Sequence, residues 1–376
     1  MKIVLAGGGT GGHFYPLIAI AEELRKIERE EKLFELDIFY FGDKVLDQEA
    51  MFINNIKYRN VFSGKIRAYS SILNFTDFFV TIVGVFSTLI KLFFIYPDVV
   101  LIKGGHASFP TAFAAKILRI PVIVHESDTY PGKVTKWAGK FAKRIAVAYP
   151  TCFKYFPKER TALVGQPIRN DIKIKAGEGV MEFLKLDPSV PVVSVIGGSS
   201  GAVLINDTIL EALPKLVEKY QVLHQTGSGD KYKDVIERSN IILTDNPKKD
   251  RYKAFEYLEP LALKMVAGAT KVFISRAGAN SIAEISIWNI PSIIIPITKS
   301  NGNHQRQNAY EYARTGKAVV IEESNLSPNI IISEIDRMLD HPDIYKKMTE
   351  AKNFIDNDKA AQIVASEIIK LASKHY

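Results

Sequence analysis

The sequence contains a single cysteine, Cys152, among its 376 residues. One cysteine excludes a disulfide framework, and it also excludes a structural zinc site built from several cysteine ligands. Cysteine-poor chains are typical of reducing compartments. We therefore expect packing, rather than disulfides or a cysteine-bound metal, to hold the fold together.

Long apolar runs are also scarce. The apolar start, Met1 to Ala6, is far shorter than a signal peptide and leads directly into glycines, so it predicts the first β-strand of a cytoplasmic protein. The longest apolar stretch is Phe78–Tyr96. Its uncharged part, between Asp77 and Lys91, is shorter than the roughly 20 residues that a membrane-spanning helix needs. A buried helix and a helix lying on an anionic membrane surface both stay open.

Neither sign of charge dominates strongly. The net charge of +8 suits an anionic substrate or membrane surface, and it is too small to mark a nucleic-acid-binding protein. With 47% hydrophobic and 24% charged residues, the composition is that of a soluble globular protein. A chain of 376 residues exceeds one ordinary core, so we expect two or three domains.

Short apolar, β-branched runs alternate with helix-length segments along the whole chain. Because these runs are apolar on both faces, they predict an α/β fold with parallel sheets covered by helices. The apolar stripe of Pro16–Lys26 predicts one such helix. The predicted strands are Ile3–Ala6, Asp37–Phe41, Val99–Ile102, Val122–His125, Ile145–Ala148, Val192–Ile196, Gln221–Gln225, Lys271–Ser275, Ser292–Pro296 and Ala318–Ile321.

The two halves of the chain resemble each other. Each opens with an apolar strand and a glycine-rich turn, Gly7–Gly12 in the first half and Gly197–Ala202 in the second. We infer two Rossmann-like domains in tandem, with a boundary near Gly165–Lys175 and ligands beyond the carboxyl ends of their strands.

The stretch Gly7–His13 is the most informative motif of the first half. Glycines let a backbone approach a phosphate, and the start of the following helix favours an anion. No Gly-Lys-Ser/Thr follows, so this is not a Walker A loop, and no acidic residue ends the second predicted strand as NAD binding would require. His13 is either a general base beside this loop or a capping or packing histidine.

Two further strand ends of the first half carry polar motifs. Gly104-Gly105-His106 follows one predicted strand, and His125-Glu126-Ser127-Asp128 ends the next. Burying two carboxylates and a histidine without partners would be costly. They either orient sugar hydroxyls or form a structural ion pair.

In the second half, Ala279, Asn280 and Ser281 open a predicted helix, where a diphosphate is favoured. Glu284 lies on nearly the same face and could accept both ribose hydroxyls, although Ser281 and Glu284 also match a capping box. The segment Asn303–Asn308 suits sugar hydroxyls or an exposed loop. We identify no metal site; the only Asp-x-Asp is Asp356-Asn357-Asp358.

Together, in this order, the motifs resemble a family of bacterial cell-wall glycosyltransferases that add N-acetylglucosamine to lipid I, making lipid II. The resemblance covers nearly the whole chain. It rests on the Gly-Gly-Thr-Gly-Gly-His loop, the Gly-Gly-Ser-x-Gly-Ala loop and the helix start Ala277–Glu284. It implies the GT-B fold, in which two Rossmann-like domains with parallel sheets face each other across a cleft. The implied domains are residues 1–167, joined by a C-terminal helix at about 355–376, and residues 168–354.

The resemblance also implies partners and residue roles. UDP-N-acetylglucosamine would be the donor, and undecaprenyl-diphosphate-linked lipid I would be the acceptor. The protein would be peripheral and bound to the anionic cytoplasmic face of the cell membrane. No nucleic acid and no required cofactor are implied, although a divalent metal is possible. His13 would be the catalytic base of an inverting transfer, together with Glu126 as a catalytic candidate. The implied donor contacts are Thr10, Gly11, Gly12, Asp128, Arg169, Ser199, Ala279, Asn280, Ser281, Glu284, His304 and Gln305. The implied contacts to the acceptor diphosphate are Gly11, Gly12, His13, Gly104 and Gly105.

The sequence departs from the family pattern in three places. His125-Glu126-Ser127-Asp128 stands where His-Glu-Gln-Asn is usual, His106 where tyrosine is common, and His304-Gln305 where some members have two glutamines. These changes affect the expected acceptor contacts more than the choice of donor. The competing hypotheses are a glycosyltransferase acting on another lipid such as diacylglycerol, an inactive homologue that only docks at a membrane, and a nucleotide-dependent oxidoreductase.

Overall fold

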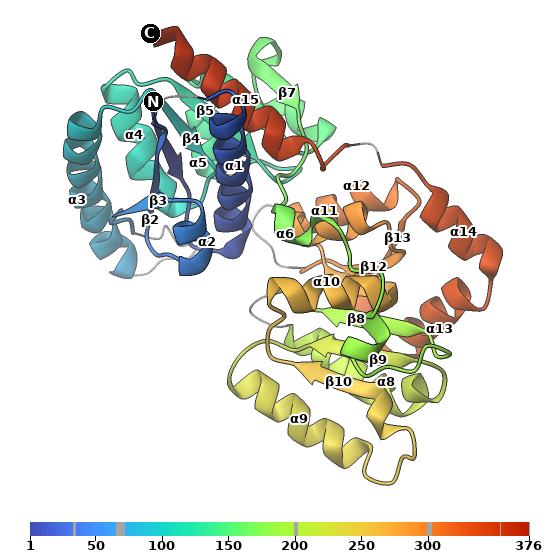
Figure 1. The fold of residues 1–376 in the computed structure, drawn as a ribbon. Coiled ribbons are helices and arrows are strands. Elements are labelled where there is room, and N and C mark those ends of the chain that lie inside the picture. The colour runs from blue at the N-terminus through green and yellow to red at the C-terminus, as the bar shows by residue number, and fades with distance from the viewer. Residues whose placement is uncertain (33–34, 65–71, 199–201, 299–302, 354, 376) are drawn as a thin grey trace. The chain divides into compact units, whose positions relative to one another are not determined.

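The structure is a computed structural model that describes residues 1–32, 35–64, 72–198, 202–298, 303–353 and 355–375 (Figure 1). Its internal contacts divide it into two compact units, residues 1–170 with 355–376, and residues 171–354. The sequence placed the first boundary at residue 167. The contacts extend the first unit to Asn170, whose backbone N–H donates to Glu22 Oε2 at 2.8 Å.

The first unit is a parallel sheet of seven strands with helices on both faces (Figure 1). The strand order is β3-β2-β1-β4-β5-β6-β7, and every pair is parallel. Its elements are β1 (Lys2–Ala6), α1 (Gly11–Glu30), β2 (Asp37–Gly42), α2 (Gln48–Ile53), β3 (Ile56–Asn60), α3 (Ile72–Ile95), β4 (Val99–Ile102), α4 (Phe109–Ile117), β5 (Val122–Glu126), α5 (Lys133–Ala138), β6 (Arg144–Val147), β7 (Thr161–Leu163) and α15 (Ala360–Ala372).

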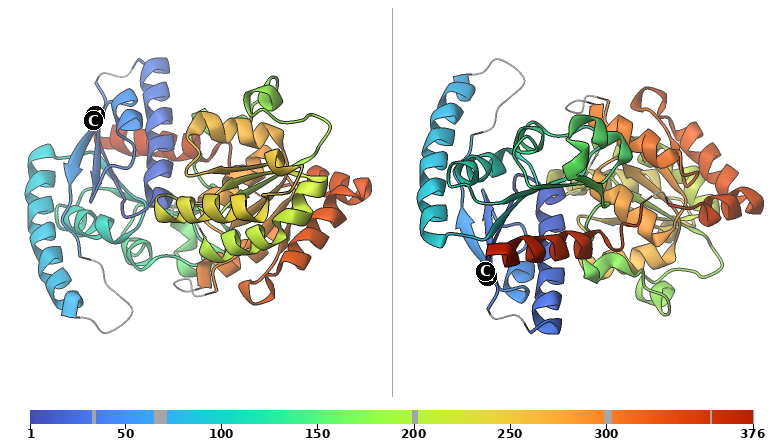
Figure 2. Two further views of the ribbon diagram at one scale, coloured as in Figure 1. Left: turned by 90° about the horizontal axis from the view of Figure 1, so that it is seen from below. Right: turned by 90° about the horizontal axis from the view of Figure 1, so that it is seen from above.

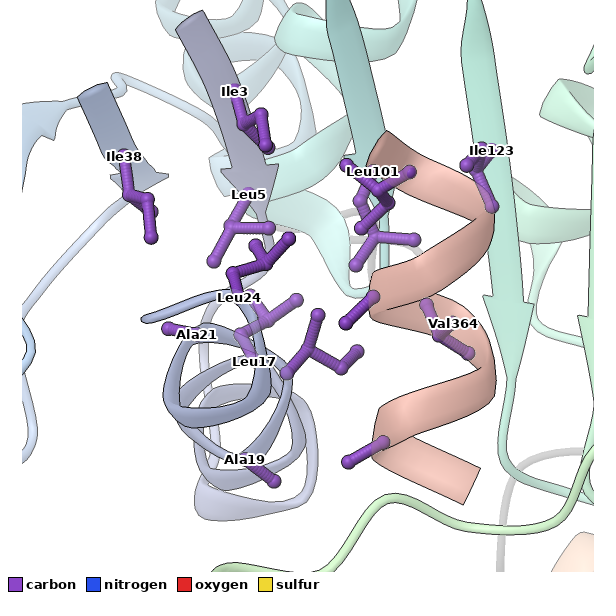
Figure 3. Close-up of a cluster of buried hydrophobic side chains, with 14 of the residues drawn as sticks. Ile3, Leu5, Leu17, Ala19, Ala21, Leu24, Ile38, Leu101, Ile123 and Val364 are labelled. Atoms are coloured by element: carbon purple, nitrogen blue, oxygen red, sulfur yellow. The ribbon is translucent and has the colours of Figure 1, made fainter. Parts of the chain in front are cut away.

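Both faces of this sheet are buried, as the apolar strands predict. Alternate residues of β1 point to opposite sides: Ile3 and Leu5 join the core beneath α1 and α15, whereas Val4 and Ala6 join the core beneath α4. Figure 3 shows the first core, where Val364 of α15 lies beside Leu101 and Ile123 of the sheet. The C-terminal helix therefore supplies part of the hydrophobic core of the first unit.

The second unit is a parallel sheet of six strands in the order β10-β9-β8-β11-β12-β13. This order repeats that of the first unit, so each sheet has the Rossmann topology. Its elements are α6 (Asn170–Lys173), which begins at the boundary, α7 (Val180–Phe183), β8 (Val192–Ile196), α8 (Val203–Lys219), β9 (Gln221–Gln225), α9 (Asp230–Ile242), β10 (Tyr252–Phe255), α10 (Pro260–Ala269), β11 (Thr270–Arg276), α11 (Ala279–Trp288), β12 (Ser292–Ile295), α12 (His304–Ala313), β13 (Ala318–Val320), α13 (Pro328–Leu339) and α14 (Pro342–Glu350).

The fully buried interpretation of Phe78–Tyr96 is wrong. The stretch forms most of α3, which stands at the edge of the first unit in both views of Figure 2 and contacts α4. Leu92 is fully buried, but Phe78, Phe86 and Phe94 are 60%, 63% and 79% exposed. The helix therefore presents a broad apolar surface.

The prediction that this apolar stretch is too short to span a membrane is also wrong. The segment Phe75–Ile95 is 21 residues long with a mean hydropathy of 2.3, which is enough to cross a membrane by length and composition. It is longer than the uncharged run because Asp77 and Lys91 lie within the helix rather than at its ends. One such helix is weak support for a membrane span.

Candidate active site

The glycine motif of the first unit lies at the switch point of its sheet. Strand order reverses between β1 and β4, and in open parallel sheets ligands bind beyond the strand ends at this point. The loop after β1 carries Gly7–His13, and the loop after β4 carries Gly104 and Gly105. The two motifs are therefore neighbours in space, although about 90 residues of sequence separate them.

Helix α1 begins at Gly11, five residues before the predicted helix, with extended Thr10 at its N-cap. This start places His13 in the first helical turn, where N–H groups favour an anion. Thr10 Oγ1 lies 3.2 Å from His13 Nδ1, and Gly9 N–H donates to Asp43 Oδ1 at 2.9 Å. Thr10 and Gly12 are exposed, so this turn is accessible to a ligand.

Gly104 and Gly105 form the wall against which the His13 ring packs. Both have positive φ, 100° and 80°, a conformation that favours glycine. A Cβ at position 105 would lie 2.6 Å from Gly8 O and 3.2 Å from His13 Nδ1. The absence of side chains at this pair therefore makes room for the histidine.

The half-buried His13 ring is neutral at physiological pH. Burial, assisted by the positive charge of Lys103, lowers its pKa to about 4, while the Asp128 carboxylate pulls in the opposite direction. A neutral imidazole at the start of a helix can accept a proton from a substrate hydroxyl. The packing alternative and the general-base alternative are thus compatible, because packing is what positions the ring.

Glu126 ends β5 in a buried, fully engaged position. Its Oε1 accepts the N–H of Asp128 at 3.1 Å, and its Oε2 accepts the N–H of Gly132 at 3.0 Å and the Thr135 hydroxyl. Burial and the neighbouring Asp128 carboxylate raise the pKa of Glu126. These contacts orient the end of β5 so that Asp128 stands near the His13 site.

His125 has a different position from its sequence neighbours. It is completely buried, and its Nε2 lies 2.9 Å from Gly165 O. Burial lowers its pKa well below the ordinary value. This histidine therefore supports the loop after β7 from inside the unit.

Lys103 is the site residue that sequence reasoning missed. It is 2% exposed, and its ammonium donates to Ser127 Oγ, which in turn donates to Gln166 Oε1 at 2.7 Å. Burial lowers its pKa to about 8, against the opposing effect of Glu126 and Asp128. The sequence does contain a signal for this residue, because the lysine directly follows a predicted buried strand and directly precedes Gly104 and Gly105.

Arg169 is packed inside the first unit. Its guanidinium lies 4.1 Å from the centre of the Tyr15 ring, and its NH1 lies 3.6 Å from Asp47 Oδ2. The side chain is only 7% exposed. Arg169 could therefore contact a nucleotide, as the sequence predicts, only while its guanidinium stays stacked on Tyr15.

The second unit repeats the arrangement at its own switch point, between β8 and β11. Helix α11 begins at Ala279 with Gly278 at its N-cap, so Asn280 and Ser281 lie in its first turn. The capping-box interpretation is wrong, because it needs Ser281 at the N-cap position. Glu284 lies one turn further along and is half-buried.

The segment expected to meet a sugar is helical from its start. Helix α12 begins at His304, after Asn303 in a left-handed conformation, so the exposed-loop interpretation is wrong for this part. Gln305 Oε1 accepts the N–H of Ile297 at 3.2 Å, which ties the helix start to the end of β12. Ser199, the remaining candidate, lies outside the described residues.

No cluster of three or more His, Cys, Asp or Glu side chains suited to a metal occurs within the described ranges. In the Asp-x-Asp segment, Asp356 Oδ1 accepts the N–H of Asp358 at 3.2 Å, and Asn357 Oδ1 accepts the N–H of Gln166 at 2.9 Å. The segment is therefore a turn that is hydrogen-bonded to the loop after β7 in the first unit.

Two Rossmann-type sheets in tandem, each with a helix start at its switch point, are the architecture of the GT-B fold. Residues 3–147 match the glycosyltransferase family 28 N-terminal domain, and residues 192–364 match the family 28 C-terminal domain. The crystal structure of Acinetobacter baumannii MurG has a TM-score of 0.72 at 20% identity and covers 98% of this chain and 99% of its own. A putative UDP-N-acetylglucosamine 2-epimerase from Listeria monocytogenes also has a TM-score of 0.72, at 15% identity, covering 100% and 97%. At these identities the likeness establishes the fold alone.

Curated relatives narrow the class to one family. The chain is 33% identical to a UDP-N-acetylglucosamine--N-acetylmuramyl-(pentapeptide) pyrophosphoryl-undecaprenol N-acetylglucosamine transferase of Clostridium novyi, over 100% of this chain and 98% of that protein. The identity is also 33% to transferase 2 of Bacillus thuringiensis subsp. konkukian, covering 94% and 95%. The chain therefore belongs to the N-acetylglucosamine transferases of this name, within glycosyltransferase family 28.

Proposed function

We propose that the protein transfers N-acetylglucosamine from UDP-N-acetylglucosamine to lipid I, forming the lipid II of peptidoglycan synthesis. The observation that carries the proposal is the His13 site, a neutral histidine packed on a glycine pair at a sheet's switch point. The similarity to named relatives over nearly the whole chain supports the choice of donor and acceptor.

The reaction is an inverting single displacement. The acceptor's sugar hydroxyl attacks the anomeric carbon of the donor, the bond to UDP breaks, and His13 accepts the hydroxyl proton. A positioned general base of this kind contributes typically 10²–10⁴-fold to the rate. The positive end of the α11 dipole stabilises the charge that develops on the leaving diphosphate.

The donor contacts come from the helix starts of the second unit. Ala279, Asn280 and Ser281 meet the diphosphate, Glu284 accepts the ribose hydroxyls, and Gln305 with His304 meets the sugar. Ser199, which lies outside the described residues, stays a proposed contact to the phosphates on the sequence motif alone. We leave Arg169 out of this set, because its guanidinium already stacks on Tyr15.

The acceptor's diphosphate belongs to the first unit. Gly11, Gly12, Gly104 and Gly105 offer backbone close to His13, without side chains that would block an approaching phosphate. Asp128 and Glu126 stand at the adjoining strand end. The reacting hydroxyl would then lie near the neutral imidazole.

The protein works as a peripheral protein on the cytoplasmic face of the membrane, where its lipid-linked acceptor lies. The support is α3, whose exposed apolar side chains are suited to the headgroup boundary, with the basic Lys91 beside them. Replacing Phe78, Phe79 and Val83 with serine removes side chains worth about 1.5–3 kcal/mol each when buried.

The triple variant is therefore expected to bind vesicles containing anionic lipid at least about 100-fold more weakly. A matched control replaces Ile174, Phe183 and Leu261, which are 76%, 52% and 59% exposed on the second unit, and should bind like the wild type. Unchanged vesicle binding by the α3 variant would reject this docking surface.

The choice of acceptor is tested directly with purified protein and UDP-N-acetylglucosamine. Lipid I should yield lipid II and UDP, whereas diacylglycerol should yield no product. Product from diacylglycerol alone would assign the enzyme to another lipid acceptor. No turnover with any lipid-linked acceptor would indicate an inactive homologue, and clear NAD binding without UDP binding would indicate an oxidoreductase.

A further inference from the structure

Arg276 and Glu323 form a largely buried ion pair at the carboxyl ends of the second unit's strands. Arg276 is the last residue of β11, and Glu323 lies in the turn that follows β13. Their side chains are 11% and 19% exposed, and Arg276 Nη1 lies 2.7 Å from Glu323 Oε1. The same Nη1 donates to the carbonyl of Ile295, the last residue of β12, at 3.3 Å. The pair therefore joins three neighbouring strand ends.

The second carboxylate oxygen of Glu323 holds the backbone that follows β12. Its Oε2 accepts the N–H of Thr298 at 2.8 Å. Burial raises the pKa of Glu323, but the hydrogen bonds from Thr298 and Arg276 hold this pKa below its ordinary value, so the carboxylate is charged at physiological pH. A charged acceptor makes these bonds stronger than bonds between neutral groups. The segment Ile295–Thr298 is thus fixed at one end by Arg276 and at the other by Glu323.

This segment in turn orients Gln305, the residue proposed to meet the sugar. The N–H of Ile297, which lies between the two anchored positions, donates to Gln305 Oε1 at 3.2 Å. An amide side chain is planar and carries one oxygen acceptor and one NH2 donor group. Because the oxygen is bound to Ile297, the direction of the NH2 group follows the position of the Ile297 backbone.

The buried guanidinium depends on Glu323 for its partner charge. Arg276 Nε is buried and has no hydrogen-bond partner among the residues that the structure describes. Well-packed apolar side chains often stabilise such a position as well as an ion pair does. They could not supply the directed hydrogen bond to Thr298, so the contribution that only the pair makes is geometric.

We propose that Glu323 is a positioning residue for the sugar of the donor. Held by Arg276, its carboxylate fixes the backbone after β12 and thereby orients the Gln305 amide, without contacting the donor itself. The inference rests on the proposed function for the identity of the sugar. Its structural content concerns the second unit alone and needs no ligand.

Hydrogen exchange in the free protein tests this structural content. Glu323→Ala removes both carboxylate oxygens, whereas Glu323→Gln keeps a single oxygen acceptor and therefore loses the contact to either Arg276 or Thr298. In both variants the backbone N–H of Ile297 should exchange at least about fivefold faster by NMR, the effect of losing one hydrogen bond. Ile297 is the diagnostic position, because its own partner Gln305 is unchanged.

Glu218→Gln is the matched control. It breaks an ion pair of similar length in the same unit, in which Lys248 Nζ lies 2.6 Å from Glu218 Oε2. Exchange at Ile297 should keep its wild-type rate in this control, because neither member of that pair contacts the segment after β12.

Calorimetry with UDP and with UDP-N-acetylglucosamine tests the role in sugar recognition. Both Glu323 variants should bind UDP like the wild type, because the proposed UDP contacts lie at the start of α11. Their affinity for UDP-N-acetylglucosamine should fall at least about fivefold, since the amide that meets the sugar is no longer held in place. A general structural role would weaken the binding of both ligands equally, or of neither.

Unchanged exchange at Ile297 in folded Glu323→Gln protein overturns the proposal, as does an equal change in Glu218→Gln. Equal weakening of UDP and UDP-N-acetylglucosamine binding also overturns it. If Glu323→Ala does not fold, Glu323→Gln decides alone. Faster exchange at Ile297 in a protein whose wild type does not bind UDP-N-acetylglucosamine would reject the proposed function and keep the positioning of Gln305.

Discussion

Gly105 offers the sharpest test of how the His13 site is built. Changing it to alanine adds one Cβ, which would lie 2.6 Å from the backbone oxygen of Gly8 and 3.2 Å from His13 Nδ1. Ordinary van der Waals contact begins at 3.4 Å, so the glycine loop has to move by several tenths of an ångström or more. Misplacement of a catalytic group by about 1 Å can cost 10²-fold in rate.

The alanine also has to adopt φ near +80°, which costs about 1 kcal/mol whatever surrounds it. Gly179→Ala is a control for that cost, because Gly179 has φ +73° and nothing within 4 Å of an added Cβ. Both variants should lose about this much stability from the backbone, Gly105→Ala should lose more because of its clash with Gly8 O, and only Gly105→Ala should lose activity, by about 100-fold.

The assay is lipid II formation at saturating donor, together with UDP affinity by calorimetry. Gly105→Ala should bind UDP like the wild type, because the proposed donor contacts lie in the second unit. Wild-type activity in Gly105→Ala, or an equal loss in Gly179→Ala, would refute the claim that this glycine pair positions His13.

Three further predictions concern the core, the pH dependence of stability and the donor site. Ile368 is fully buried in α15, so Ile368→Ala should lower the unfolding free energy by about 2–5 kcal/mol in calorimetry. Ile363 on the same helix is 45% exposed, so the control Ile363→Ala should change the unfolding free energy by less than about 0.5 kcal/mol. Equal effects of the two variants would mean that α15 is not part of the core. Burial lowers the pKa of His224 to about 3, so the unfolded chain takes up a proton below about pH 6.5 while the folded state stays neutral. Stability then falls as the pH falls through this window, and between pH 7.5 and 5 the wild type should lose about 2 kcal/mol more than His224→Gln in urea titrations; equal losses would contradict the burial argument. Glu284→Gln should weaken UDP binding about tenfold, and calorimetry showing no change would remove Glu284 from the ribose contacts.

The interior strands of both sheets could be predicted from the sequence, and three edge strands could not. β1, β4, β5 and β8 are apolar on both faces, which is the pattern of a strand covered by helices on each side. By contrast, β3 alternates buried Ile56 with exposed Lys57, and β7 and β10 are also edge strands with little buried surface. An edge strand has only one neighbour, so its composition resembles that of a loop.

In the candidate site, too, local features could be predicted from the sequence and long-range contacts could not. The glycine turns and His13 could be found from the sequence, because a strand followed by glycines and a helix is a local pattern. The buried position of Lys103 could not, since its hydrogen bond to Ser127 spans 24 residues of the chain and the bond from Ser127 to Gln166 spans 39. The burial that lowers its pKa likewise depends on the assembled sheet.

The central claim is that His13 is the proton acceptor of the transfer to lipid I, and His13→Ala tests it most directly. The measurement is the rate of lipid II formation by the wild type and the variant, with UDP affinity determined on the same preparations. We expect that the wild type forms lipid II, that the variant is slower by about 10²–10⁴-fold, and that UDP affinity is unchanged. A variant that keeps its transfer rate, or one that loses UDP binding together with activity, would contradict it.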